Sequence, residues 1–150
     1  MALIETGAEA PAVPGVAFGD GPVALLFYKD SCPVCQMAAP VSAAFEAAMP
    51  GRLVGVGQDD EARRARFAET YGFAARSVGD LPPYDVSNAY GIVSVPTLVL
   101  VGRDGVVADV SGAWDRTAWN RIAATMAGDL GVPPVTVSEA GDGRPPFKPG

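Results

Sequence analysis

The chain has 150 residues, of which 49% are hydrophobic and 19% are charged, and its formal net charge is −6. That length and composition predict one folded domain with a buried core and argue against a disordered chain. The acidic balance argues against a nucleic-acid partner, and no apolar run approaches the roughly 20 residues of a membrane span, so we expect neither nucleic acid nor membrane as a partner.

The first half of the chain begins with an irregular segment, a strand and a helix. Residues 1–22 contain several Pro and Gly residues and predict an irregular lead-in. The uninterrupted apolar run at residues 23–29 predicts a strand that is buried on both faces of a sheet. Apolar residues at helical spacing then run from Val34 to Ala48, and Pro40 should kink this helix because it lacks a backbone donor.

A second strand and a second helix follow. Residues 52–58 predict another short strand. Residues 59–72 predict a helix, since the segment opens with acidic residues and ends at Gly72. A looser stretch comes next, with a turn at residues 79–85 and a helical turn at residues 86–92.

The second half of the chain predicts a hairpin, a helix and a tail. Residues 95–102 predict a buried strand, and residues 106–112 an antiparallel partner joined to it by a tight turn. The last helix should begin after Asp115 as its N-cap and end at Gly131. Residues 132–150 hold five of the 14 prolines and predict a tail that is extended or disordered.

The order of these elements predicts the fold class. Alternating strands and helices in the first half are typical of a parallel crossover, while the second half ends in an antiparallel hairpin. We therefore expect an α/β fold in which a mixed central sheet has helices on both faces.

The stretch DSCPVC contains Cys32 and Cys35, the only cysteines of the chain. Two cysteines at this spacing occur in haem anchors, zinc sites, disulfide staples and redox pairs. A haem anchor needs His directly after the second cysteine, where this chain has Gln36. A closed zinc site needs four ligands, which two Cys and no His cannot supply. A site shared between chains, two-coordinate Cu(I) and a short structural disulfide remain as alternatives.

A redox pair of thiols makes physical demands that the sequence meets. Cys32 at the start of a helix is favoured as a thiolate by free backbone N–H groups and the helix dipole. Pro33 suits the first helical turn. Cys35 lies one turn further and can attack a mixed disulfide at Cys32, so Cys32 is the predicted nucleophile and Cys35 the resolving thiol. Lys29 would favour the thiolate and Asp30 oppose it, unless both are merely solvated loop charges.

A proline at the start of the third predicted strand is a second unusual feature. The strand that begins with Val95 and Pro96 otherwise reads as central, although proline cannot donate to a sheet ladder. Either the backbone there is special, for instance a cis peptide, or Pro96 is an ordinary first residue of a strand. The pattern alone leaves both alternatives open.

Three stretches together resemble the thioredoxin superfamily. LLFYKDSCPVCQMAAP is similar to its strand–CxxC–helix segment, YGIVSVPTLVLVGRDGVV to its cis-proline strand and hairpin, and SGAWDRTAWNRIAATM to the start of its last helix. They cover about residues 20–130. The extra segment at about residues 59–85 resembles the TlpA-like thiol–disulfide oxidoreductases, which are grouped with alkyl-hydroperoxide-reductase/TSA-like domains.

This resemblance implies a thioredoxin-like domain over residues 1–131. It implies a cis peptide before Pro96, close to the sulfurs, and a backbone at Val95 that pairs with an extended substrate segment. Pro33 and Val34 would shape the site between the cysteines. It also implies protein disulfide substrates and an upstream thiol reductant as partners, and no cofactor or metal beyond the redox-active disulfide itself.

The sequence departs from the usual pattern of the superfamily in four places. One is the dipeptide between the cysteines, which is Pro33-Val34 where thioredoxin usually has Gly-Pro. Ser31 stands where thioredoxin usually has Trp, and Leu26 stands where it has a buried acid. Ala38 stands where TlpA-like reductases often have Glu. Neither usual place therefore holds a proton acceptor for the resolving thiol, and water, Asp30 or Asp85 are candidates to replace it.

The predicted function is thiol–disulfide exchange, and two other functions remain as alternatives. One is a peroxiredoxin-like thiol peroxidase, although such enzymes usually carry Thr where this chain has Lys29. The other is a non-catalytic thioredoxin-fold module that binds a partner or carries a metal. No signal peptide is visible at the N-terminus, so we expect a cytoplasmic monomer, with an exported form trimmed of its signal as an alternative.

Overall fold

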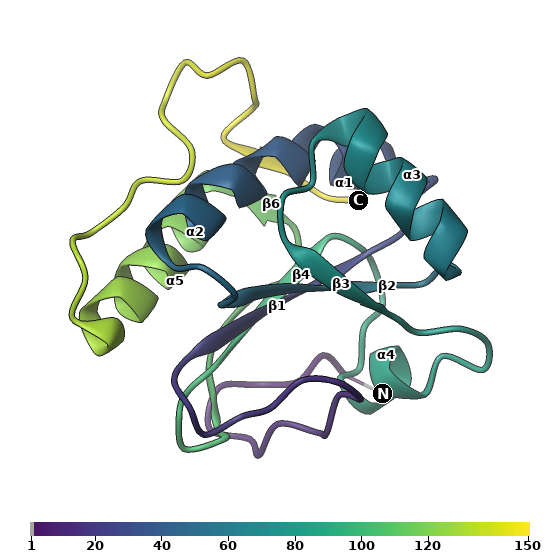
Figure 1. The fold of residues 1–150 in the computed structure, drawn as a ribbon, viewed down its shortest axis with the longest axis horizontal. Coiled ribbons are helices and arrows are strands. Elements are labelled where there is room, and N and C mark those ends of the chain that lie inside the picture. Colours follow the sequence, from purple (N-terminus) through teal and green to yellow (C-terminus); the bar gives the residue numbers. More distant parts are fainter. Residues whose placement is uncertain (1) are drawn as a thin grey trace.

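A mixed sheet of five strands lies at the centre of the computed structural model, which describes residues 2–150 (Figure 1). The strands are β1 (Val23–Tyr28), β2 (Leu53–Gly57), β3 (Arg76–Gly79), β4 (Thr97–Val101) and β5 (Val107–Ser111). Their order in the sheet is β3-β2-β1-β4-β5. β1, β2 and β3 run parallel, whereas β4 is antiparallel to both β1 and β5. The mixed α/β sheet predicted from the sequence is confirmed.

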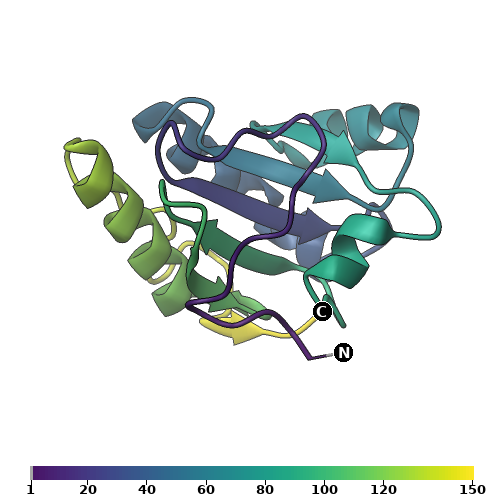
Figure 2. The same cartoon turned by 90° about the horizontal axis from the view of Figure 1, so that it is seen from below.

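Most of the helices cover one face of this sheet. The helical elements are α1 (Pro33–Ala38), the 3-10 turn η1 (Ala39–Val41), α2 (Ser42–Ala48), α3 (Glu61–Tyr71), α4 (Asp85–Ala89) and α5 (Arg116–Leu130). Side chains of α1, α2, α3 and α5 pack into one core on the same side of the sheet, while α4 packs on the opposite side (Figure 1). The lead-in runs across that opposite face beside α4 (Figure 2). None of the helices in residues 2–150 is both long and apolar enough to cross a membrane.

The strand β1 explains why the sheet needs covering on both faces. All six of its residues are buried, as its apolar run predicts. Successive side chains of a strand point to opposite faces, so each face of the sheet receives an apolar stripe. The stripe under the helices contains Ala24, Leu26 and Tyr28, and the stripe under the lead-in and α4 contains Val23, Leu25 and Phe27.

Pro40 divides the first long helical segment, as expected. The segment is regular as far as Ala38, tightens into the 3-10 turn, and resumes as α2. Ser42, buried just after the turn, donates its hydroxyl to the carbonyl of Ala39 at 2.6 Å and accepts the N–H of Ala74 at 2.8 Å. The kink is therefore tied to the chain that leads into β3.

The ends of α5 follow the predicted capping residues. The carboxylate of Asp115 accepts the N–H of Ala118 at 3.1 Å, which satisfies a free donor of the first turn. Gly131 ends the helix with φ 68° in the left-handed region, where glycine has no steric penalty. The predicted start and end of the last helix are thus confirmed.

The sequence does not predict the short strand β3, because its residues belong to the stretch that we interpret as loose. None of its four residues is fully buried, because it forms the edge of the sheet. Without an apolar run or a clear alternation, its sequence carries no strand signal. Its backbone pairs with β2 in parallel register from Val54 opposite Arg76 to Gly57 opposite Gly79.

Residues 132–150, for which the sequence predicts a tail that is extended or disordered, run without a helix along the domain and pack on it. Asn120 of α5 holds the segment: its side-chain carbonyl accepts the N–H groups of Val137 and Ser138 at 2.8 and 3.1 Å. Further on, β7 (Phe147–Lys148) pairs antiparallel with β6 (Trp114–Asp115). Such bonds between side chains and an irregular backbone leave no periodic pattern in a sequence.

Candidate active site around Cys32 and Cys35

The two cysteines lie where β1 ends and α1 begins. Cys32 is the N-cap residue of α1, and its sulfur accepts the backbone N–H of Cys35 at 3.2 Å. Cys32 is partly exposed, whereas Cys35 is only 3% exposed and belongs to the core under the helices. Both are free thiols in this structure. Pro33, the first residue of α1, is exposed beside Cys32.

The loop before β4 comes within contact distance of Cys32. The Cys32 sulfur lies 3.5 Å from the carbonyl oxygen of Val95, a residue 63 positions further along the chain. The Val95–Pro96 peptide bond is cis. β1 and β4 are neighbours in the sheet, so the C-terminal end of β1 and the N-terminal end of antiparallel β4 meet at one edge. The fold thus brings together the two motifs that the sequence singled out.

The two thiols have opposite acidities. The hydrogen bond from the Cys35 side chain, aided by backbone N–H groups of Cys35 and Val34, lowers the pKa of Cys32 from 9.0 to about 6 despite partial burial. Burial, together with the same hydrogen bond, raises the pKa of Cys35 well above its ordinary value. At neutral pH one sulfur is therefore a thiolate at the surface and the other a buried thiol, which matches the roles of nucleophile and resolving thiol.

The charges of Lys29 and Asp30 are not what lowers the pKa of Cys32, because its causes are hydrogen bonds within α1. Lys29 is exposed. The Asp30 carboxylate is partly buried and lies 3.7 Å from the exposed guanidinium of Arg63 on α3, a long contact of little energetic weight. Tuning of the Cys32 pKa by the charges of these two side chains stays a prediction.

The backbone of Asp30, in contrast, is held from both sides. Its N–H donates to the carboxylate of Asp59 at 2.8 Å, and its carbonyl accepts the side-chain amide of Gln36 at 2.8 Å. Asp59 is only 6% exposed, and this burial raises its pKa while the Asp30 N–H opposes the shift. The two contacts fix the loop that carries Cys32.

Asp59 is a residue that we missed, although a signal for it exists in the sequence. It follows β2 by two residues, and β2 is the parallel neighbour of β1. The carboxyl ends of parallel strands meet at one edge of a sheet, so an acid after β2 is expected near the loop after β1. Asp85, a candidate proton acceptor from the sequence, lies instead on α4 across the sheet from α1.

Val34 and Pro96 are buried, whereas Pro33 is exposed. Val34 is buried in the core under the helices, so it supports the loop between the cysteines from below. Pro96 is also buried, while Val95 is partly exposed. A small pocket of about 160 Å³ borders Val95. Pro33 and Val95 thus both contribute to the surface around Cys32.

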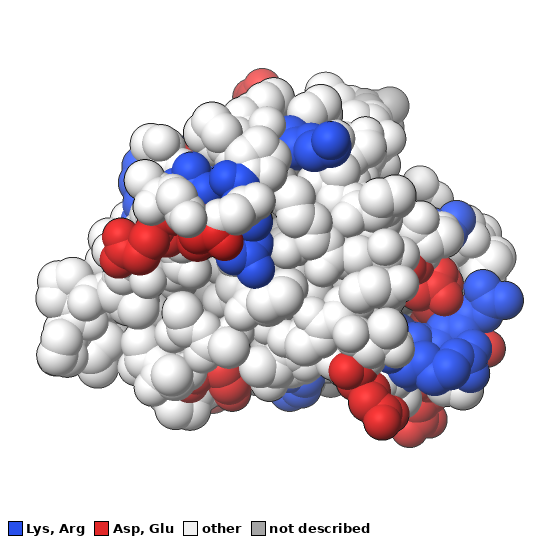
Figure 3. All heavy atoms as spheres, turned by 90° about the horizontal axis from the view of Figure 1, so that it is seen from above, with Lys and Arg blue, Asp and Glu red and all other residues white. Residues whose placement is uncertain are grey.

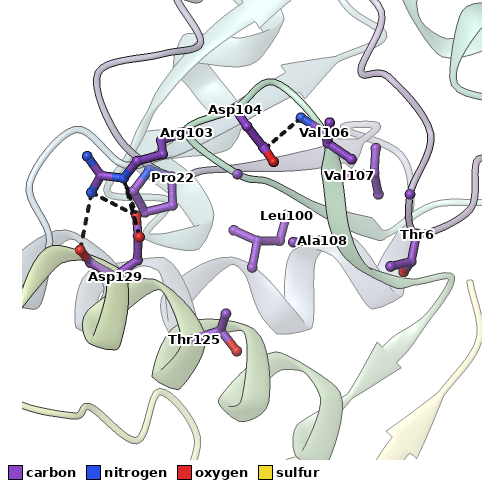
Figure 4. A pocket seen from close by; sticks show the side chains of 12 residues that line it. Thr6, Pro22, Leu100, Arg103, Asp104, Val106, Val107, Ala108, Thr125 and Asp129 are labelled. Carbon is purple, nitrogen blue, oxygen red and sulfur yellow. Dashed lines mark hydrogen bonds and ion pairs between the residues drawn. The ribbon is translucent and has the colours of Figure 1, made fainter.

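A second pocket, on another part of the fold, is separate from the cysteines. It has a volume of about 490 Å³ and lies at the end of β4 that is remote from Thr97, between the lead-in, the β4–β5 turn and the end of α5. Figure 4 shows Leu100 and Thr125 in its wall and Arg103 paired with Asp129 at its rim, at 2.9 Å. Its position excludes it from chemistry at Cys32.

The surface over α1–α3 carries charges of both signs. Figure 3 shows acidic and basic side chains in mixed groups on that face, separated by a broad uncharged area. Arginines of α3 stand beside acidic residues of the same helix. A continuous basic surface for nucleic acid is therefore not present on this face.

The lowered pKa predicts how Cys32 reacts with an alkylating reagent. The rate of modification by iodoacetamide should rise with pH through a midpoint of about 6, because only the thiolate reacts. In Cys35→Ala the midpoint should move up toward the ordinary value of 9.0, since the main hydrogen bond to the Cys32 sulfur is lost. A midpoint near 9.0 in the wild-type protein would show that the hydrogen bonds do not lower the pKa of Cys32.

The sequence of the chain matches the model of a known protein family. A family model described as the AhpC/TSA family matches residues 15–110, which is more than half of the chain. No curated protein sequence is significantly similar to the chain.

Solved structures share the fold. The thioredoxin domain of a thiol-disulfide oxidoreductase from Bacteroides vulgatus is 23% identical, with a TM-score of 0.63, over 72% of this chain and 89% of that chain. A thiol:disulfide interchange protein from Bacteroides sp. is 25% identical, with a TM-score of 0.63, over 74% and 83%. The dsbF protein of MTB, solved in mixed oxidized and reduced forms, is 28% identical, with a TM-score of 0.54, over 63% and 70%.

Proposed function

Because the chain belongs to the AhpC/TSA family and has a thioredoxin-like fold, we propose that it is a thiol–disulfide oxidoreductase with Cys32 as nucleophile and Cys35 as resolving thiol. The observation that carries this proposal is the state of the Cys32 sulfur. It is partly exposed at the start of a helix, its pKa is lowered to about 6, and a buried second thiol is hydrogen-bonded to it.

The first half of the reaction uses Cys32. Its thiolate attacks one sulfur of a substrate disulfide, a new S–S bond forms between protein and substrate, and the old S–S bond breaks. The displaced substrate sulfur leaves as a thiolate and takes a proton. The raised pKa of Cys35 keeps that thiol protonated during this step, so it does not compete for the substrate.

The second half releases the substrate. Cys35 gives up its proton and attacks the Cys32 sulfur, the bond from Cys32 to the substrate breaks, and the second substrate sulfur leaves as a thiol. The substrate has then gained two electrons and two protons, and the protein holds a Cys32–Cys35 disulfide. An upstream thiol reductant restores the two thiols by the same chemistry in reverse.

The surroundings of Cys32 support a protein as the substrate. The carbonyl of Val95 lies beside the sulfur, so an extended substrate segment that pairs with the Val95 backbone would bring its disulfide to Cys32. Pro33, the residue after Cys32 in the chain, is exposed. We expect a monomer that needs no cofactor beyond its own disulfide, and a cytoplasmic location remains our prediction.

Reduction of insulin disulfides by dithiothreitol tests the proposed function. The wild-type protein should accelerate insulin precipitation, and Cys32→Ser should lower the rate to that of dithiothreitol alone, since no nucleophile remains. Lys29→Ala is the control, because it removes an exposed charge and leaves the hydrogen bonds that lower the pKa of Cys32. This variant should retain activity within about twofold. Equal rates for wild type and Cys32→Ser would refute the proposal.

A peroxidase remains the alternative that the same protein preparation can test. Peroxide would oxidise the Cys32 thiolate to a sulfenic acid, which Cys35 would then convert to a disulfide with loss of water. Rapid loss of thiols at micromolar peroxide, without insulin reduction, would favour this alternative over disulfide exchange.

A further inference from the structure

The last seven residues of the chain lie against the elements that form the candidate active site. We call residues 144–150 the tail segment. Its first residue, Arg144, donates through Nε to the carbonyl of Met37 on α1 at 3.0 Å. The indole of Trp114 donates to the carbonyl of Pro145 at 2.7 Å. Figure 1 shows this yellow end of the chain beside α1, far from the end of α5 where residues 132–150 begin.

The tail segment ends on the carbonyl group that Cys32 contacts. Gly150 packs so closely on Val95 that a Cβ added at Gly150 would collide with the Val95 carbonyl oxygen and approach Pro96. The same oxygen lies 3.5 Å from the Cys32 sulfur. Between these two ends the segment is extended, since Phe147 and Lys148 pair with β6. The tail segment therefore runs as a strand from α1 to the loop before β4.

We propose that the tail segment occupies the surface on which an extended substrate segment binds, so that tail and substrate compete for access to Cys32. The proposal rests on the proposed function, because it takes Cys32 as the reacting group. A substrate whose disulfide reaches Cys32 must bring its own backbone to Val95. Since the backbone of Gly150 already fills the space at that carbonyl, the end of the tail must move before a substrate binds.

The tail segment is held strongly at its first residues and weakly at its last ones. We therefore expect the last residues to detach first. Its base is held by Asp142, whose carboxylate pairs with Arg116 at 3.1 Å and with Arg144 at 3.0 Å and accepts the hydroxyl of Ser138 at 2.6 Å. These bonds hold the pKa of Asp142 well below its usual range. The base is thus a fixed anchor at any pH near neutrality.

The outer part of the tail is held far more weakly. Phe147 is 57% exposed, and Lys148 and Pro149 are exposed as well, so little apolar surface is lost if they leave. What holds them is the pairing with the two residues of β6 and the contact of Gly150 with Val95. Residues 147–150 can therefore detach while Arg144 and Pro145 stay bound to α1 and Trp114.

The proposal is tested by deleting residues 147–150 and, in the full chain, by Gly150→Ala. Alkylation of Cys32 by a bulky maleimide, measured at pH 8 where the thiol is ionised, should become about threefold faster or more in the deletion variant, because the site is no longer covered for most of the time. Gly150→Ala should change the rate in the same direction. Lys148→Ala keeps the backbone of the tail and should react like the wild type.

Insulin reduction by the same variants separates this proposal from the proposed function. If both hold, the deletion also raises kcat/KM for insulin, and a synthetic peptide RPPFKPG added to the deletion variant lowers it again. If only the proposed function fails, alkylation is faster but no variant reduces insulin. If the deletion variant and Gly150→Ala both fold, as judged by circular dichroism, and both alkylate at the wild-type rate, the tail does not cover the site and the proposal is wrong.

Discussion

Replacing Cys35 by Ser should trap a substrate on Cys32 as a mixed disulfide. The serine hydroxyl can still donate toward the Cys32 sulfur, so the thiolate remains available for attack. A hydroxyl cannot displace a disulfide at neutral pH, so the second half of the reaction stops. Turnover of insulin should fall on the order of a hundredfold or more, while the first attack persists.

Mass spectrometry under non-reducing conditions measures the trapped species. Cys35→Ser incubated with insulin should carry one insulin chain that dithiothreitol removes, and the double variant Cys32→Ser/Cys35→Ser should carry none. If Cys35→Ser turns over at the wild-type rate, then Cys35 is not the resolving thiol. If an adduct forms in Cys32→Ser, the assignment of the two roles must be reversed.

Trp119→Ala should cause the largest loss of stability among single substitutions in the core under the helices. The indole is 1% exposed and packs edge-on against Trp114 with ring centroids 4.8 Å apart. Its N–H donates to the carbonyl of Ala113 at 3.1 Å. Removing the ring leaves a cavity and takes away one of the two hydrogen bonds to the Ala113 carbonyl, which still accepts the Ser111 hydroxyl at 2.8 Å. The free energy of unfolding should therefore drop by about 3–5 kcal/mol, mostly because of the cavity.

Urea unfolding followed by circular dichroism measures this effect. Val93→Ala is the control, because Val93 is 79% exposed and its truncation should change the free energy of unfolding by less than about 0.5 kcal/mol. Trp119→Phe should fall between the two, since it keeps an aromatic ring but loses the N–H donor. A loss below about 1 kcal/mol in Trp119→Ala would show that the core rearranges to fill the space.

The parts of the fold that were predictable from sequence have a local physical signal. The apolar run of β1 and the hydrophobic spacing of α5 each reflect burial of their own side chains, and Pro40 interrupts its helix because of its own covalent structure. β3 lacked such a signal because it lies at the edge of the sheet with partly exposed residues.

In the candidate site, too, some residues have a local signal in the sequence and others do not. The pair of cysteines stands out in the sequence because few kinds of site have two cysteines at that spacing. The proline before β4 stands out because proline cannot donate to a sheet ladder. The role of Asp59 depends on a bond to Asp30, 29 residues away, and the position of Gly150 depends on how the segment after α5 folds back. Contacts of this kind follow from the topology, so they became visible only in the folded chain.

The bonds that hold the Asp30 peptide also bear on how this protein can change in evolution. The position of Cys32 is set by Asp59 and Gln36 through backbone atoms of Asp30, whereas Ser31 and Pro33 are exposed on either side of the sulfur. Mutations at those two positions can therefore accumulate without moving the Cys32 sulfur. Changes there would alter what surrounds the sulfur while the loop that carries it stays in place, whereas Val34, which is buried in the core, is not free to vary in the same way.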